Sequence, residues 1–325
     1  LGKKRFSELL APGGRIYHET HYAPLLRMQG EAREIALEIV RADGSRLPAL
    51  VNSVLVDGPE GEPQVIRTTV FDASDRRRYE EELLRARRRE QEIAQQLQRS
   101  MLTGELPGGD GLEVSAGYRP AESGMDIGGD WYDSFWLDDG RIGLVVGDVV
   151  GRGIEAAAAM GQLRSAVRVL ASTDLRPAAL LEALDAYATR HGVGSMATLV
   201  YAELDPASRQ LRFACAGHPP PAIVAPGDDP RLAWDGRSLP LGVRLNDSQR
   251  PEADCALEPG GLVLLYTDGV VERRGEIIDV GLERLLESLR AHREERPELL
   301  TANLLRALGG GEHRDDACLL AASLA

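Results

Sequence analysis

Four aspartate-containing motifs stand at the ends of apolar runs that lie far apart in the chain. They are GGDWYD at 128–133, VGDV at 146–149, YTDG at 266–269 and RDDA at 314–317. If the apolar runs are strands of one sandwich, the carboxylates converge at one edge, where two like charges about 4 Å apart repel by roughly 4 kcal/mol at an effective dielectric near 20. Such a cluster needs a cation.

Two of the motifs also fit other families, but only locally. Residues 151–156, GRGIEA, mimic the glycine fingerprint of a dinucleotide site, yet the helix that follows leads to Pro177 and a second helix instead of a parallel strand. GGD at 128–130 is similar to the start of a GGDEF cyclase motif, but Trp131 and Tyr132 stand where its acidic and aromatic residues belong. We therefore reject both assignments.

Composition and charge narrow the class of protein. The 325 residues are 43% hydrophobic and 27% charged, which is ordinary for a soluble globular protein, and no apolar run approaches the roughly 18 residues of a membrane helix. Residues 103–325 carry 21 basic and 35 acidic side chains, a balance that disfavours nucleic acid. We expect a cytoplasmic protein with no nucleic-acid partner. Because the first residue is Leu1, we expect a fragment, within which no membrane segment is seen and upstream of which one stays possible. The cysteines have no metal or redox spacing and predict buried thiols: Cys215, Cys255 and Cys318.

The N-terminal third predicts a small α/β module. Alternating Ile35, Leu37 and Ile39, followed by the turn residues DG at 43–44, indicate an antiparallel meander over residues 33–71. The hairpin sequence RADGS and the last strand, which ends in TVFDASDR, resemble the C-terminal half of a PAS sensor domain. We expect residues 1–74 to be an N-terminally incomplete PAS-like module whose ligand is unknown.

A long helix follows this module. Asp72 or Ser74 can cap it, and apolar residues near heptad spacing over 79–101 alternate with arginines and glutamates. We predict a coiled-coil linker over residues 75–102 that joins two chains into a homodimer. Pro107 and its neighbouring glycines break the helix, so the third domain is predicted to span residues 103–325.

Within this third domain, strands and helices come in blocks. The predicted strands are 112–119, 130–137, 141–148, 196–204, 210–216, 221–225, 262–267 and 317–323, and the predicted helices are 153–171, 177–190 and 280–307. Because the elements do not alternate strictly, the fold class is α+β with antiparallel sheets.

Five motifs in a fixed order point to one family. GGDWYD, GDVVGRG, AGHPPP, YTDGVVE and RDDA together strongly resemble the metal-dependent, type 2C-like serine/threonine phosphatases of the sporulation stage II E class, over about residues 95–325. The resemblance implies an α-β-β-α sandwich of two antiparallel sheets with two Mn²⁺ or Mg²⁺ ions at one edge. Oxygen-only ligation suits these ions better than zinc, and two ions can share and activate a water that attacks a phosphate.

The resemblance also assigns residues. Asp148 is expected to bridge the two ions and, with Asp130, to carry catalysis through the metal-activated water. The implied metal ligands are Asp130, Asp148, the Val149 carbonyl, Asp268 and Asp315, with Asp316 as a supporting residue or substitute ligand. Val149 and Val150 stand where eukaryotic relatives carry a histidine proposed as general acid, so no proton donor is assigned. Arg152 and His218 are candidate phosphate contacts, although Arg152 also fits a solvated helix start and His218 a loop-fixing hydrogen bond.

The function implied by the resemblance is dephosphorylation of a phosphoserine or phosphothreonine on a small partner protein. The substrate would be a phosphorylated STAS-type anti-sigma-factor antagonist in bacterial stress or developmental signalling, with activity set by the PAS-like module. Two alternatives stay open: a pseudophosphatase that binds a phosphoprotein without turnover, and a signalling scaffold made of the PAS-like module and coiled coil.

Overall fold

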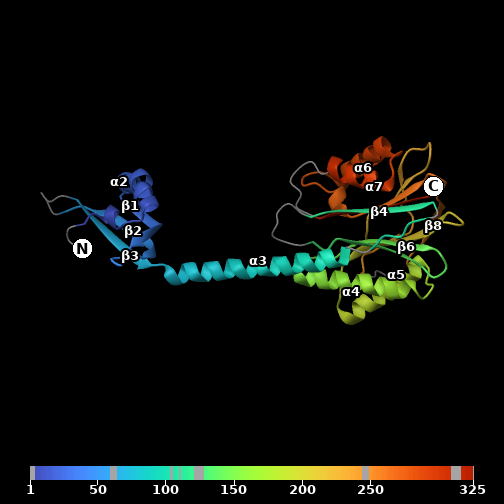
Figure 1. Cartoon of the computed structure of the whole chain (residues 1–325), viewed down its shortest axis with the longest axis horizontal. Helices are drawn as coiled ribbons and strands as arrows, with labels where there is room; N and C mark the ends of the chain where they lie inside the picture. The colour runs from blue at the N-terminus through green and yellow to red at the C-terminus, as the bar shows by residue number, and fades with distance from the viewer. Residues whose placement is uncertain are drawn as a thin grey trace. The chain divides into compact units, whose positions relative to one another are not determined.

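The computed structural model describes residues 4–58, 64–102, 105–109, 111–120, 128–243, 249–308 and 316–324. The chain divides into two compact units, Leu1–Arg88 and Arg89–Ala325. The division falls inside helix α3 (Ser74–Leu102), whose two ends lie close to the boundaries expected from the sequence (Figure 1). Each unit is therefore described by itself.

The N-terminal unit is a three-stranded antiparallel sheet with helices packed on one face. Its strands, in sheet order, are β1 (Glu31–Val40), β2 (Arg46–Val56) and β3 (Val65–Asp72). Four helical segments precede them, and the sequence pattern had not predicted these: η1 (Phe6–Leu9), α1 (Pro12–Tyr17), η2 (His18–Tyr22) and α2 (Ala23–Gln29). Alternate strand residues such as Leu37 and Val51 pack against Tyr22 and Leu26 of the helices, which gives the unit its own small core.

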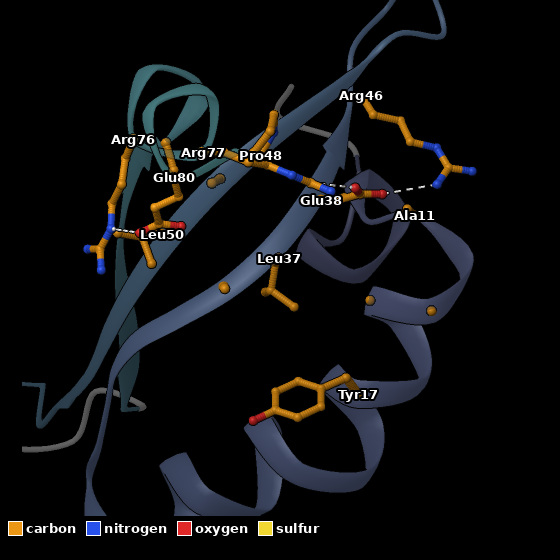
Figure 2. Close-up of a pocket in the computed structure, with 15 residues that line it drawn as sticks. Ala11, Tyr17, Leu37, Glu38, Arg46, Pro48, Leu50, Arg76, Arg77 and Glu80 are labelled. Atoms are coloured by element: carbon orange, nitrogen blue, oxygen red, sulfur yellow. Dashed lines mark hydrogen bonds and ion pairs between the residues drawn. The ribbon is translucent and has the colours of Figure 1, made fainter. Parts of the chain in front are cut away.

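Ion pairs tie the start of α3 to this sheet. A hollow of about 650 Å³ lies beside β1, β2 and the first turns of α3. Glu38 lines it and accepts hydrogen bonds from Arg46 and Arg77 at 3.0 Å each (Figure 2). Asp72 also accepts a hydrogen bond from the Ser74 backbone N–H at 2.8 Å, as an N-terminal cap does. The ion pairs are exposed to solvent and therefore add little stability, while the Asp72 cap helps to orient the first turn of α3.

The C-terminal unit contains two sheets. One has five strands in the order β10-β9-β13-β14-β4, and the other has the order β11-β8-β7-β6-β5, with β12 beside β8. Its strands are β4 (Leu112–Arg119), β5 (Trp131–Trp136), β6 (Ile142–Asp148), β7 (Thr198–Asp205), β8 (Gln210–Ala216), β9 (Ala222–Val224), β10 (Arg231–Leu232), β11 (Arg237–Ser238), β12 (Ala253–Ala256), β13 (Leu262–Tyr266) and β14 (Ala317–Leu324). All of these pairings are antiparallel except β11 with β8. The α+β prediction is confirmed.

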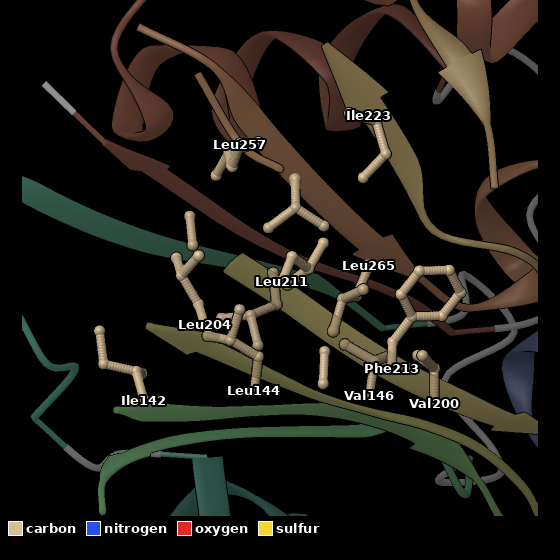
Figure 3. Close-up of a cluster of buried hydrophobic side chains, with 14 of the residues drawn as sticks. Ile142, Leu144, Val146, Val200, Leu204, Leu211, Phe213, Ile223, Leu257 and Leu265 are labelled. Atoms are coloured by element: carbon tan, nitrogen blue, oxygen red, sulfur yellow. The ribbon is translucent and has the colours of Figure 1, made fainter. Parts of the chain in front are cut away.

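Three apolar layers hold the helices and sheets together. In β6, Ile142, Leu144 and Val146 face the core between the sheets (Figure 3), while Val145 faces the helices on the other side. This period of two is what a strand buried on both faces requires. Helices α4 (Ile154–Ala171) and α5 (Pro177–His191) cover the six-stranded sheet, and α6 (Ile278–His292) and α7 (Pro297–Ala307) cover the other.

The helix predicted over 280–307 is in fact two helices. Pro297 stands at the first position of α7, and the preceding Arg296 is extended, with ψ 151°. Proline lacks a backbone N–H and disfavours helical geometry at the residue before it, so a single helix cannot run through this point. The break lets α6 and α7 pack on the same sheet.

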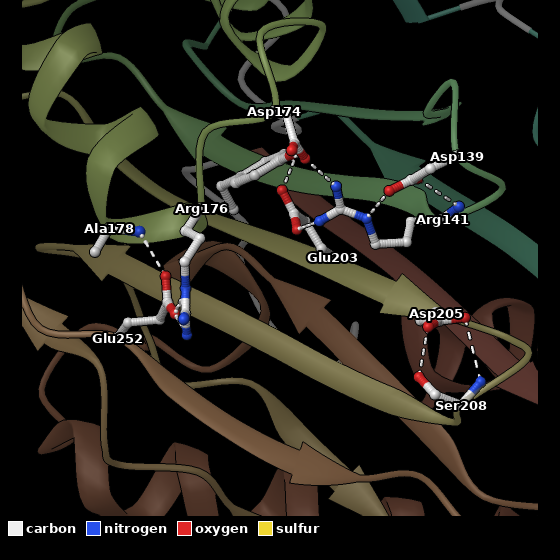
Figure 4. A network of polar contacts seen from close by, with 10 residues as sticks. Asp139, Arg141, Asp174, Arg176, Ala178, Glu203, Asp205, Ser208 and Glu252 are labelled. Carbon is white, nitrogen blue, oxygen red and sulfur yellow. Dashed lines mark hydrogen bonds and ion pairs between the residues drawn. The ribbon is translucent and has the colours of Figure 1, made fainter.

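Charged groups fasten the edge of the six-stranded sheet where β6 begins. Arg141 pairs with the buried Glu203 of β7, with Asp139 in the β5–β6 turn and with Asp174 in the α4–α5 connection (Figure 4). This network lies at the opposite end of β6 from Asp148. The network ties the connection between α4 and α5 to the start of β6, and it does not involve the end of the strand where Asp148 lies.

Candidate metal centre

Three aspartates from both sheets meet at one edge of the sandwich. Asp130 precedes β5, Asp148 ends β6, and Asp268 follows β13 of the other sheet. One carboxylate oxygen from each lies within 4.8 Å of those of the other two. The convergence expected from the sequence is thus seen for these three residues.

Asp130 is the most deeply buried of the three. Its pKa is raised well above the ordinary value, first by burial and then by the negative charges of Asp148, Asp268 and Asp316. Thr267 donates a hydrogen bond from Oγ1 to Asp130 Oδ2 at 2.6 Å, which opposes that shift, and Thr267 in turn accepts one from the Cys318 backbone N–H at 2.9 Å. Among the described residues, no basic side chain forms an ion pair with Asp130. The site therefore favours a bound cation.

Glycines bring the backbone segments around the cluster into close contact. A Cβ on Gly129 would lie 2.0 Å from the Val149 carbonyl oxygen, and one on Gly269 would lie 1.8 Å from the Asp316 carbonyl oxygen. Both approaches are possible only without a side chain. The glycines of the GGD and DG motifs therefore serve to pack the loops that carry the aspartates.

Asp316 belongs to the same edge but is held by the protein. It is buried, and its Oδ2 accepts hydrogen bonds from the Tyr118 hydroxyl at 2.5 Å and from the Gly128 backbone N–H at 3.0 Å. These contacts tie β4 and the GGD loop to the start of β14. Asp315 lies outside the described residues, so its expected role as a ligand stays a prediction.

The two candidate phosphate contacts occupy different environments. Arg152 is exposed in the β6–α4 loop, between Gly151 and Gly153, whose φ values of +113° and +86° permit the tight turn after Asp148. His218 is buried, its Nδ1 lies 2.9 Å from Thr198 Oγ1, and burial lowers its pKa to about 3. A neutral, enclosed imidazole is better suited to holding Thr198, the β7 partner of Asp148, than to binding phosphate.

Asp133 is a residue of the site region that our sequence reasoning did not single out. It is buried on β5 and accepts hydrogen bonds from Arg168 at 2.6 and 2.8 Å and from Arg164 at 3.1 Å. Arg168 also lies over the Phe135 ring, 5.0 Å from its centre. The spacing of Arg164 and Arg168, one helical turn apart on a predicted helix, was the available signal. This cluster fastens α4 to the strand that follows Asp130.

The donor atoms fit a hard divalent cation. Carboxylates and the adjoining Val149 carbonyl supply oxygen only, the ligand type that Mg²⁺ and Mn²⁺ prefer. A cation also offsets the mutual repulsion of three carboxylates and the cost of burying Asp130. The residues present therefore fit a Mg²⁺ or Mn²⁺ site.

The family of the chain follows from a match to its C-terminal part. Residues 138–325 match the sequence profile described as "Stage II sporulation protein E (SpoIIE)". The chain belongs to the SpoIIE family. The match includes Asp148, Asp268 and the RDDA motif, while the GGD motif lies upstream of it.

Curated relatives agree with this SpoIIE assignment. The chain is 31% identical to phosphoserine phosphatase RsbU of Bacillus subtilis over 186 residues, which are 57% of this chain and 54% of RsbU. It is 22% identical to phosphoserine phosphatase RsbP of the same organism over 318 residues, 81% of this chain and 76% of RsbP. The chain thus spans about half the length of RsbU and about three quarters of RsbP.

Solved structures show the same fold. The RsbU and RsbW domains of a Mycobacterium tuberculosis protein match with a TM-score of 0.61 and 34% identity, over 67% of this chain and 61% of that one. The PP2C phosphatase domain of Bacillus subtilis SpoIIE matches with a TM-score of 0.54 and 17% identity, over 66% and 64%. The C-terminal unit therefore has the PP2C phosphatase fold. In the part of the chain that the structure describes, we find no helix with the length and apolarity to cross a bilayer.

Proposed function

We propose that this SpoIIE-family chain is a metal-dependent phosphoprotein phosphatase. The observation that carries the proposal is the meeting of Asp130, Asp148 and Asp268 at one edge of a PP2C fold, with no basic partner for the buried Asp130 among the described residues. The names of RsbU and RsbP as phosphoserine phosphatases support it.

The residues have separate tasks in this proposal. Asp148, at the end of β6, would be the ligand shared by two Mn²⁺ or Mg²⁺ ions, and Asp130, Asp268, the Val149 carbonyl and Asp315 would complete their ligation. Bound ions of this kind supply an activated water and neutralise charge that develops on the phosphate. Thr267 and Asp316 hold the ligand loops in place through the hydrogen bonds described above.

The substrate in this proposal is a phosphorylated anti-sigma-factor antagonist, as the resemblance of the motifs implies.

The N-terminal unit and α3 regulate the reaction in this proposal, with two chains joined along α3. Support for this part is the exposure of apolar side chains on α3, including Tyr79, Leu83 and Ile93, at spacings that suit a helix pair. A sedimentation measurement of the full chain, expected to give a dimer, tests it, and a monomer at all concentrations would contradict it.

One assay tests the catalytic proposal. Purified protein with Mn²⁺ should release phosphate from a phosphoserine protein, and Asp148→Ala should abolish release, while Asp138→Ala in the exposed β5–β6 turn should not. Phosphoprotein binding without turnover in the unmutated protein would instead identify a pseudophosphatase. If the unmutated protein neither binds nor dephosphorylates the phosphoprotein, the result would favour the alternative of a signalling scaffold.

A further inference from the structure

Three exposed apolar side chains lie at the same sheet edge as the aspartate cluster. Val150, Met196 and Leu239 have exposed fractions of 65%, 49% and 38%. Val150 lies two residues after Asp148. Met196 lies two residues before Thr198, which is the β7 residue paired with Asp148. Because neighbouring strands are about 4.8 Å apart, the turn that carries Met196 leaves the sheet one strand away from Asp148.

Backbone hydrogen bonds place the third residue beside the second. The Met196 N–H donates to the Leu241 carbonyl and the Leu241 N–H donates to the Ala197 carbonyl, both at 2.9 Å. Leu239, two residues before Leu241, follows the end of β11, next to β8 in the same sheet. The three residues therefore belong to segments that leave adjacent parts of one sheet at one edge.

Met196 lies in a hydrogen-bonded turn with an unfavourable backbone conformation. Its φ of +66° lies in the left-handed region that a residue with a side chain seldom adopts. The turn is closed by the hydrogen bond from the Ala197 N–H to the Gly194 carbonyl at 2.9 Å, in addition to the contact with Leu241. Backbone strain of this kind, maintained by its surroundings around an exposed apolar side chain, points to a binding role.

A phosphorylated serine or threonine side chain is short, so the backbone of the partner protein that carries it must come close to this sheet edge. With the phosphate at the Asp130, Asp148 and Asp268 cluster, the residues flanking the phosphoserine lie against whatever surrounds the cluster. On the six-stranded sheet, these surroundings include the three apolar residues. The net charge of −14 that residues 103–325 carry, from 21 basic and 35 acidic side chains, opposes a carrier with acidic flanks.

We propose that Val150, Met196 and Leu239 form a docking surface that selects a phosphoserine or phosphothreonine flanked by apolar side chains on the partner protein. This inference rests on the proposed phosphatase function and adds the class of phosphorylation site that the enzyme accepts. Met196 is the central residue of this surface, because its exposed side chain comes from a hydrogen-bonded, strained turn just before β7, the strand paired with that of Asp148.

The test compares two phosphoserine peptides of equal length, one with leucine and valine flanks and one with glutamate flanks, with p-nitrophenyl phosphate as a third substrate. The full chain with Mn²⁺ should have a kcat/KM at least about 10-fold higher for the apolar peptide. Met196→Asp should reduce that preference to about threefold or less, chiefly through a higher KM for the apolar peptide. Met28→Asp is the matched control, because Met28 is 85% exposed on α2 of the other unit, and it should keep the preference.

The outcomes separate this inference from the proposed function. If the unmutated protein hydrolyses none of the three substrates, the phosphatase proposal fails. If it hydrolyses both peptides equally well, the phosphatase proposal stands and the docking surface is wrong. A loss in Met196→Asp that is equal for p-nitrophenyl phosphate and for the apolar peptide would show a structural effect and overturn the docking role. Leu239→Asp, made in a segment with ordinary backbone geometry, gives the same test if the Met196 variant does not fold.

Discussion

Two buried aspartates three residues apart lie in opposite electrostatic environments. Asp130 and Asp133 have exposed fractions of 3% and 4%. Asp133 faces α4 and pairs with Arg168 at 2.6 Å and Arg164 at 3.0 Å. Asp130 faces the other sheet, where its hydrogen-bond donor is Thr267 and its charged neighbours are carboxylates. Side chains alternate between the two faces of an extended segment, so residues three positions apart, such as Asp130 and Asp133, point to opposite faces.

The difference separates a carboxylate that the protein itself compensates from one that is a candidate metal ligand. A buried charge is tolerated when a counter-charge and hydrogen bonds satisfy it. The chain supplies that counter-charge for Asp133 through two arginines of α4. For Asp130 the described residues supply none, and in the proposed function a bound cation supplies it. The strand β5 thus binds helix α4 through Asp133, and the candidate metal ligand Asp130 lies just before the strand begins.

The largest effect is expected for Asp130→Asn. Asparagine keeps the shape and an acceptor for Thr267 but removes the charge that a cation needs. Mn²⁺-dependent hydrolysis of p-nitrophenyl phosphate should fall by roughly 100-fold or more, because the ion supplies several kcal/mol of charge stabilisation. Calorimetric titration should show weaker Mn²⁺ binding, and unchanged affinity would remove Asp130 from the ligand set.

Asp133→Asn should instead affect stability. The substitution leaves the partly buried Arg164 without its counter-charge, so the free energy of unfolding should fall by about 3 kcal/mol. This value is at the low end for a broken buried ion pair, because the second partner, Arg168, is half exposed. Urea denaturation measures this, with the exposed Asp138→Asn as control. If Asp133→Asn weakens Mn²⁺ binding as much as Asp130→Asn does, the contrast between the two aspartates is false.

A smaller effect on metal affinity is expected at Thr267. Thr267→Val removes the hydrogen bond to Asp130 and should lower Mn²⁺ affinity by about 10-fold, as is usual when a supporting hydrogen bond to a ligand is lost. Thr267→Ser retains the hydroxyl and should bind Mn²⁺ nearly as well as the unmutated protein. Equal affinities for the valine and serine variants in calorimetry would show that the hydroxyl does not position Asp130.

The last expected effect is on the pH dependence of stability in the metal-free protein. Because the pKa of Asp130 is raised in the folded state, its ionisation destabilises the fold as the pH rises through that pKa. In EDTA the unmutated protein should therefore be less stable than Asp130→Asn at pH 7, and the gap should narrow as the pH falls towards 4, by about 1.4 kcal/mol for each unit of pKa shift. Urea denaturation at several pH values checks this. A gap that widens at low pH would contradict the assigned direction.

The predictability of the molecule differs between its two units. In the C-terminal unit, apolar runs such as Ile142–Asp148 and Leu262–Tyr266 identified the strands, because both of their faces are buried and the sequence is continuously hydrophobic. In the N-terminal unit the alternation of Ile35, Leu37 and Ile39 predicted β1, but the helices over 12–29 were missed. Their pattern is weak, since few of their side chains are buried.

By itself, the sequence determined the family, the order of the five motifs and the aspartates that are candidates for binding a hard cation. These properties are local, because residue type and short spacing carry them. Only the tertiary structure decided that Asp130 and Asp268 meet across two sheets, that Asp133 is neutralised by α4, and that His218 is enclosed behind Thr198. Those outcomes depend on how segments 20 or more residues apart pack, and packing is a property of the whole fold that no single segment encodes.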